Sequence, residues 1–237
     1  MKIIIFFIVL FVANVIQAIT GFAGTLLAMP VSILLLGVNK AKVILNIMTF
    51  LSCLCIALKE RKYIRYSILG KIILFMGIGM AVGVLLFENI SLDFLLLLYG
   101  ILIIAIACKN IFGSRKKKKV VKKSLMTVSL LAAGVIHGMF VSGGALLVIY
   151  ATSVLKEKKT FRATIAAVWV ILNGGLMVSD YIHNCITGEV IKIIVLGIVP
   201  LFVAIAIGNK IHDQINQKIF LTITYILLLI SGLSIIF

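Results

Sequence analysis

Two glycine-rich segments, one in each half of the chain, carry residues that could bind an anion. They span 17–27 and 137–147 and lie 120 positions apart in a sequence of 237 residues. Glycine leaves the backbone open to close approach by a ligand. A helix that restarts after such a break presents unpaired N–H groups and the positive end of its dipole, which together favour an anion.

Helices are expected to restart after Gly24 and Gly144. Several nearby side chains could add hydrogen bonds to a bound anion. Because no Lys or Arg appears deep inside an apolar run, the sequence predicts an anion held by backbone and hydroxyl groups rather than by buried cations. The candidate substrate-binding residues are Gln17, Thr20, Gly21, Gly24, Thr25, His137, Gly138, Ser142, Gly143 and Gly144, with Asn46 and Asn173 in the helices that follow. The alternative is that these glycines only allow close helix packing.

Histidine could couple transport to protons. His137 is the only histidine deep in an apolar run, where it could titrate or instead stay neutral and hydrogen-bonded. His183 and His212 are expected in solvated loops, and Asp180 at a solvated helix end. Trp169 is expected to serve packing.

The composition is that of a polytopic α-helical membrane protein. Hydrophobic residues make up 63% of the chain and charged residues 13%, with a mean hydropathy of +1.28. An average soluble domain is about 45–50% apolar and about 25% charged. The net charge of +16 is assigned to cytoplasmic loops rather than to nucleic-acid binding. We find no signature of an enzyme, no catalytic residues and no metal or cofactor motif.

Ten apolar segments are expected, four of them short: 3–16 with 25–37, and 124–138 with 145–155. Half-helices of 11–15 residues cover about 16–22 Å, less than a membrane core of about 30 Å. Each short pair is therefore either a broken spanning helix or a re-entrant hairpin. The positive-inside rule favours a hairpin in the second half, with 109–123 in the cytoplasm, and leaves the first half open.

If both pairs are hairpins, each half continues with three transmembrane helices and the second half is inverted relative to the first. The sequence then divides into an N-terminal membrane repeat (1–112), a basic cytoplasmic linker (113–123) and a C-terminal membrane repeat (124–237). The fold class is all-α, with two pseudo-symmetric halves and a site where the breaks meet.

These residues resemble the sulfite exporter TauE/SafE family of membrane permeases. The resemblance rests on Gln17, Thr20, Gly21, Phe22 and Gly24 with Pro30, then on Gly134, Gly138, Gly143 and Gly144, and on Arg162-Ala163-Thr164. The sequence departs from the family pattern at Ala23, Ala145 and Tyr150. The resemblance implies transport of small anions such as sulfite, organosulfonates or other organic acids, coupled to protons.

The first interpretation is therefore a multi-pass secondary transporter of the cell (plasma) membrane, an exporter that works by alternating access. Its expected partners are the lipid bilayer, a small anionic substrate and protons, with a homodimer left open and no nucleic acid. A passive anion channel would give flux that ignores a pH gradient. A non-transporting scaffold subunit would give no flux.

Overall fold

The computed structural model describes residues 2–89 and 123–214, together with Asn216 and scattered positions between 91 and 108. Two expected segments, 93–112 in large part and 217–236, lie outside the described residues, as does nearly all of the basic segment 109–123 that was assigned to the cytoplasm. Within the described ranges every regular element is a helix.

The helices are α1 (Lys2–Thr20), α2 (Gly24–Leu36), α3 (Val38–Lys59), the short 3₁₀ helix η1 (Arg61–Tyr63), α4 (Tyr66–Asn89), α6 (Lys123–Phe140), α7 (Gly144–Val154), α8 (Lys158–Ile182) and α9 (Gly188–Gln214). Five of those described are long and apolar enough to cross a membrane: α1, α3, α4, α8 and α9. The chain is therefore a multi-pass α-helical membrane protein.

Both expected helix breaks are present, and each is only three residues long, at 21–23 and 141–143. The helices before the breaks are longer than expected, with 19 residues in α1 and 18 in α6. Both helices of each pair were expected to be half-helices. This expectation was wrong for α1 and α6, the first helix of each pair. The helices after the breaks, α2 and α7, are short, at 13 and 11 residues.

The chain folds back on itself at each break. A Cβ atom placed on Gly24 would lie 2.6 Å from the carbonyl oxygen of Ala13, whereas eleven residues of unbroken helix would separate these positions by about 16 Å. In the same way, a Cβ atom on Gly143 would overlap the carbonyl oxygen of Ala133. Each short helix therefore returns along the helix before it, as a hairpin.

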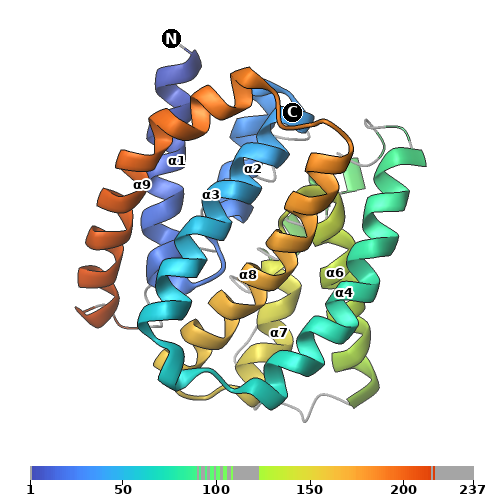
Figure 1. Cartoon of the computed structure of the whole chain (residues 1–237). Coiled ribbons are helices and arrows are strands. Elements are labelled where there is room, and N and C mark those ends of the chain that lie inside the picture. The colour runs from blue at the N-terminus through green and yellow to red at the C-terminus, as the bar shows by residue number, and fades with distance from the viewer. Residues whose placement is uncertain are drawn as a thin grey trace.

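The helices pack as two outer pairs around a central pair. In Figure 1, α1 lies against α9 on the left, α4 against α6 on the right, and α3 beside α8 between them. Thus α1, the first helix of the first half, packs on α9 of the second half, and α6, the first helix of the second half, packs on α4 of the first half. The helix bounds correspond as well, since the starts of α7 and α8 follow the starts of α2 and α3 by 120 positions.

Glycines allow α4 and α6 to approach very closely. A Cβ atom on Gly83 would overlap the Val135 carbonyl oxygen, and one on Gly138 would overlap that of Met80. Gly79 and Gly134 make equivalent backbone contacts, so both helices present a Gly-x-x-x-Gly face. The structure places Gly138 in this seam, facing α4 rather than the break.

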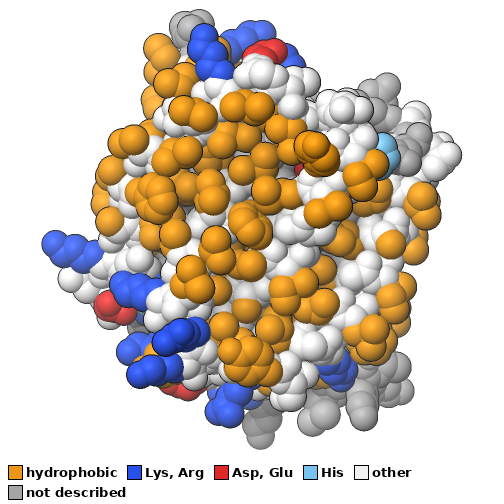
Figure 2. All heavy atoms as spheres, viewed as in Figure 1, with side chains coloured by type: hydrophobic (Ala, Val, Ile, Leu, Met, Phe, Trp, Pro, Cys, Tyr) orange, Lys and Arg blue, Asp and Glu red, His pale blue; other side chains and the backbone are white. Residues whose placement is uncertain are grey.

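The surface has the polarity of a membrane protein. Figure 2 shows a broad band of hydrophobic side chains between two ends at which Lys and Arg gather. At one end Lys40 pairs with Glu189 at 2.6 Å, which brings together the starts of α3 and α9. At the other end Glu60, directly after α3, pairs with Arg162 near the start of α8. We name the former the Lys40 end and the latter the Arg162 end.

Candidate functional site

Side chains already satisfy the backbone of the first break. Thr20 Oγ1 accepts hydrogen bonds from the N–H groups of Phe22 and Ala23, each at 3.1 Å. Gln17 Oε1 accepts from Gly24 N–H at 2.8 Å, while Gln17 Nε2 donates to Gly21 O at 3.1 Å. Three of the N–H groups that the sequence offered to an anion are therefore engaged within the chain.

The second break is less completely satisfied. Ser142 Oγ donates to Phe140 O at 2.8 Å, and the cap residue of α7, Gly143, makes no side-chain cap hydrogen bond. The first hydrogen bond along α7 runs from Leu147 N–H to Gly143 O, so the N–H groups of Gly144, Ala145 and Leu146 precede it. Helix N–H groups in that position have no acceptor within their own helix.

Val141 adopts a strained backbone conformation in the second break. Its φ is +54°, and the corresponding residue of the first break, Gly21, has φ +81°. A β-branched residue pays for this left-handed conformation, which glycine adopts freely. Such strain is concentrated at binding and switch sites.

The two breaks meet in the interior. A Cβ atom on Gly144 would lie 2.8 Å from the Phe22 carbonyl oxygen, so the start of α7 abuts the first break. A Cβ atom on Gly21 would lie 3.2 Å from the Arg162 carbonyl oxygen, so the first break also adjoins α8. Thr25 is buried in the first turn of α2. The structure thus brings together residues of both breaks that are distant in sequence.

Beside the second break lies a group of buried polar side chains with unused hydrogen-bonding capacity. The His137 ring stacks at a tilt on Trp169, with ring centroids 4.8 Å apart, and the Asn173 amide lies next to it. No described residue provides a hydrogen-bond partner in good geometry for either nitrogen of His137, for either amide atom of Asn173 or for Trp169 Nε1. Unsatisfied groups of this kind are costly unless a ligand or water meets them.

Asn46 extends this group toward the Lys40 end. Its Nδ2 donates to Asp180 Oδ2 at 3.2 Å and lies 3.4 Å from Asn173 O, while its Oδ1 has no partner among the described residues. Asp180 is only 8% exposed. The expectation of a solvated Asp180 was therefore wrong, because the Asn46 amide holds its carboxylate between α3 and α8.

The corresponding pair in the first half is fully bonded. Gln17 and Cys53 precede His137 and Asn173 by 120 positions, and Gln17 Nε2 donates to Cys53 Sγ at 3.1 Å. The two halves thus place side chains in matching positions but satisfy only the first pair internally. The unused polar groups lie at the second break.

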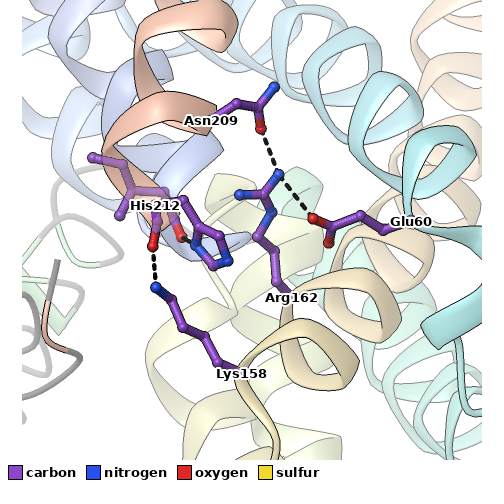
Figure 3. Close-up of polar contacts among 6 residues, drawn as sticks. Glu60, Lys158, Arg162, Asn209 and His212 are labelled. Atoms are coloured by element: carbon purple, nitrogen blue, oxygen red, sulfur yellow. Dashed lines mark hydrogen bonds and ion pairs between the residues drawn. The ribbon is translucent and has the colours of Figure 1, made fainter. Parts of the chain in front are cut away.

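Arg162 is a buried cation that sequence reasoning missed. The residue is 1% exposed, and its Nη2 meets Glu60 Oε1 at 3.2 Å and donates to Asn209 Oδ1 (Figure 3). The sequence has no Lys or Arg deep inside an apolar run, and from this we expected no buried cation at the site; Arg162 is nevertheless buried, because α3 and α9 cover the first turns of α8. Burial raises the pKa of Glu60, against the opposing effect of the Arg162 charge and of the nearby lysines.

His212 also lies in this cluster rather than in a solvated loop, so that expectation was wrong too. It is 3% exposed on α9, and its Nδ1 lies 2.7 Å from Ile19 O, an atom that can only accept. Lys158 Nζ donates to the His212 carbonyl oxygen, as Figure 3 shows. These contacts join the start of α8 to the end of α9, and the end of α9 to the end of α1.

Each end of the molecule has a pocket with charged side chains in its lining. The pocket at the Arg162 end has a volume of about 210 Å³ and is lined by Lys59, Glu60, Tyr63, Lys159, Arg162, Asn209 and Asp213. The pocket at the Lys40 end has a volume of about 160 Å³, and its lining includes Lys42, Phe87, Asp180 and His183. The Lys42 ammonium lies 4.2 Å from the centroid of the Phe87 ring.

One face of α8 connects the two pockets. Arg162, Trp169, Asn173 and Asp180 follow one another at intervals of 7, 4 and 7 residues, which keeps them on one helix face over a rise of about 27 Å. This spacing is visible in the sequence and could have identified Arg162, Trp169 and Asp180 as site residues. The face passes the region where the two breaks meet.

The family model described as sulfite exporter TauE/SafE matches residues 6–235, which is nearly the whole chain. No curated protein and no solved structure matches the sequence.

Proposed function

Because this chain belongs to the sulfite exporter TauE/SafE family and is accordingly a membrane transporter, we propose that it exports a small oxyanion, such as sulfite or an organosulfur or organic acid, across the plasma membrane. Transport proceeds by alternating access around the two helix breaks. The protein binds and moves its substrate without converting it chemically.

The observation that carries this proposal is the set of unused polar groups at the second break. Neither ring nitrogen of His137 and neither side-chain amide atom of Asn173 has a hydrogen-bond partner in good geometry among the described residues, and His137 lies beside the start of α7. A Cβ atom on Gly143 would lie 2.9 Å from His137 Cβ. Helix N–H groups, an imidazole and an amide can all donate to one oxyanion, and the helix dipole adds a favourable potential.

Gln17, Thr20, Gly21 and Gly24 have a different part in this proposal. Their hydrogen bonds hold the first break in shape, so that Phe22 and α7 meet. Asn46 links the substrate site to Asp180 and thus to the pocket at the Lys40 end. The anion then enters and leaves along the polar face of α8.

Two inverted halves provide the motion for alternating access. The reciprocal packing of α1 on α9 and of α6 on α4 is what a two-fold relation between 1–112 and 124–237 would produce. Rocking of the hairpins against the central α3–α8 pair would open one pocket while it closes the other. The positive-inside rule places the Arg162 end, with its lysines in 156–159, in the cytoplasm.

His137 is the proposed proton carrier. It is 1% exposed, and it is the one histidine that lies beside the unused polar groups of the second break. An ordinary histidine changes charge between pH 5 and pH 8. A protonated ring would balance the charge of the anion, so the proton and the substrate would move together.

Efflux from proteoliposomes tests the function. The purified full chain is reconstituted, loaded with ³⁵S-sulfite and followed with and without a pH gradient. We expect saturable efflux that the gradient accelerates. Asn173→Leu should reduce it about tenfold or more, because a hydrogen bond to a charged group contributes about 1.5–3 kcal/mol.

Asn14→Leu is the matched control, since Asn14 is also buried but its amide bonds only to Leu10 O of the same helix. It should retain most of the efflux. Efflux that ignores the gradient would identify a passive channel instead. A folded, inserted protein that moves none of sulfite, sulfoacetate, other sulfonates or simple carboxylates would identify a scaffold subunit.

A further inference from the structure

We propose that Arg162 is a second anion-binding position on the path, and that the Glu60 carboxylate occupies it until a substrate oxyanion takes its place. The inference rests on the proposed function, since it concerns the same anion before it reaches the second break. Binding at Arg162 would release Glu60 and free α3 from α8 at this end.

The guanidinium of Arg162 is incompletely engaged. Its Nη2 contacts Glu60 and Asn209, but its Nε and Nη1 have no hydrogen-bond partner among the described residues. Glu60 uses only Oε1, and its Oε2 is likewise buried without a partner. A buried ion pair is stable only when its geometry is good and its remaining hydrogen bonds are satisfied. This single-contact pair is therefore readily exchanged for a better acceptor.

The surrounding pocket suits a small anion. Its volume of about 210 Å³ is several times the roughly 30 Å³ that one water molecule occupies in the liquid. Its lining contains three cations, Lys59, Lys159 and Arg162, and two carboxylates, Glu60 and Asp213. The balance is positive, and displacement of Glu60 from Arg162 would expose the guanidinium to the bound anion.

The position of Arg162 connects the pocket with the substrate site. Its backbone lies against Gly21 of the first break, and its side chain shares a face of α8 with Trp169, at a rise of about 10 Å. An anion on Arg162 therefore lies between the open end of the pocket and the second break.

A similar arrangement of charge recurs at the other end of the path. Lys42 lies 120 positions before Arg162, and Asp180 lies 120 positions after Glu60. Both residues line the pocket at the Lys40 end. The Glu60–Arg162 ion pair closes the Arg162 end, and the Lys40–Glu189 ion pair bridges the starts of α3 and α9 at the other end.

Equilibrium binding of ³⁵S-sulfite to the purified full chain tests the proposal. Glu60→Gln removes the competing charge while it keeps the size of the side chain, so the apparent Kd should fall about tenfold. Arg162→Lys should raise the Kd by about tenfold or more, because a lysine lacks the planar set of donors. Glu60→Asp, which shortens the reach to Arg162, serves if Glu60→Gln does not fold.

Glu157→Gln is the control. It removes one exposed carboxylate at the same end of the molecule, but Glu157 neither lines the pocket nor pairs with Arg162, so the Kd should change by less than about threefold. An equal gain in Glu157→Gln and Glu60→Gln would show a general charge effect and overturn the proposal. An unchanged or weaker affinity for sulfite in both Glu60→Gln and Glu60→Asp would overturn the proposal as well. Efflux of sulfite by the wild-type chain would in that case still support the proposed transport function. If the wild-type chain neither binds nor transports sulfite, both proposals fail.

Discussion

Glu60 and Arg162 join the end of α3 to the start of α8 by an ion pair of 3.2 Å, although they lie 102 positions apart in the sequence. Their counterparts 120 positions away, Asp180 and Lys42, line the pocket at the opposite end of the same two helices. The antiparallel α3–α8 pair therefore carries an acid and a base at each end. Between these ends lie the helix breaks and the unused polar groups of the second break.

A larger side chain at Gly144 should abolish transport. In Gly144→Leu the side chain would run into the carbonyl oxygen and ring of Phe22, where the start of α7 meets the first break. Efflux should fall to the level of empty liposomes while the protein remains inserted. Gly70→Leu is the control, since a Cβ atom there meets no atom within 4 Å. Normal efflux of every bound substrate by Gly144→Leu would contradict the assigned site.

Close packing of α4 on α6 should make Gly83 sensitive to a single methyl group. Gly83→Ala would press its Cβ against the Val135 carbonyl oxygen and should destabilise the protein by about 1–3 kcal/mol, as overpacking does. The thermal midpoint of the detergent-purified protein measures this. Gly77→Ala on the same helix meets no atom within 4 Å and should be neutral or slightly stabilising. Equal midpoints for both variants would argue against the seam.

Much of this architecture was accessible from the sequence because it depends on backbone breaks. Glycine clusters and apolar runs predicted the membrane class, both breaks and their 120-residue offset. The lengths of α1 and α6 were underestimated, since α1 continues past the polar Gln17 to Thr20 and α6 continues past Gly138 to Phe140.

The burial of Arg162, Asp180 and His212 was missed for another reason. Each lies near a helix end, where local sequence resembles a solvated loop, and only tertiary contacts with other helices cover it. The spacing along α8 and the 120-residue offset between Glu60 and Asp180 held a usable signal. By contrast, no pattern in the sequence predicted that side chains of the same chain would occupy the N–H groups of the first break.

The orientation of the chain can be tested by labelling at opposite ends. Lys156 and Glu189 are both exposed, near the Arg162 end and the Lys40 end respectively. With Cys185 replaced by serine, a membrane-impermeant maleimide should label Glu189→Cys on intact cells and Lys156→Cys only after permeabilisation. The reverse pattern would place the Arg162 end outside and would overturn the assignment from loop charge.

The raised pKa of Glu60 predicts a pH dependence at the Arg162 pocket. Burial moves this pKa above its usual 4.5. As the pH falls, the Glu60 carboxylate is therefore protonated at a higher pH than an ordinary glutamate. Its competition for Arg162 then weakens. Affinity for methanesulfonate, whose charge stays constant, should therefore rise between pH 7.5 and pH 5 in the wild type. Glu60→Gln should show tight binding with a flat profile; an identical slope in both would contradict this role.

Trp169 offers the most direct measurement of the central claim, that a small anion binds among the unused polar groups at the second break. It is the only tryptophan in the sequence and stacks on His137, so its fluorescence reports on that site alone. Titration of the purified wild-type chain with sulfite should give a saturable fluorescence change that Gly144→Leu and Asn173→Leu lose. An unresponsive Trp169 in wild-type protein that still exports sulfite would place the substrate elsewhere and contradict this account.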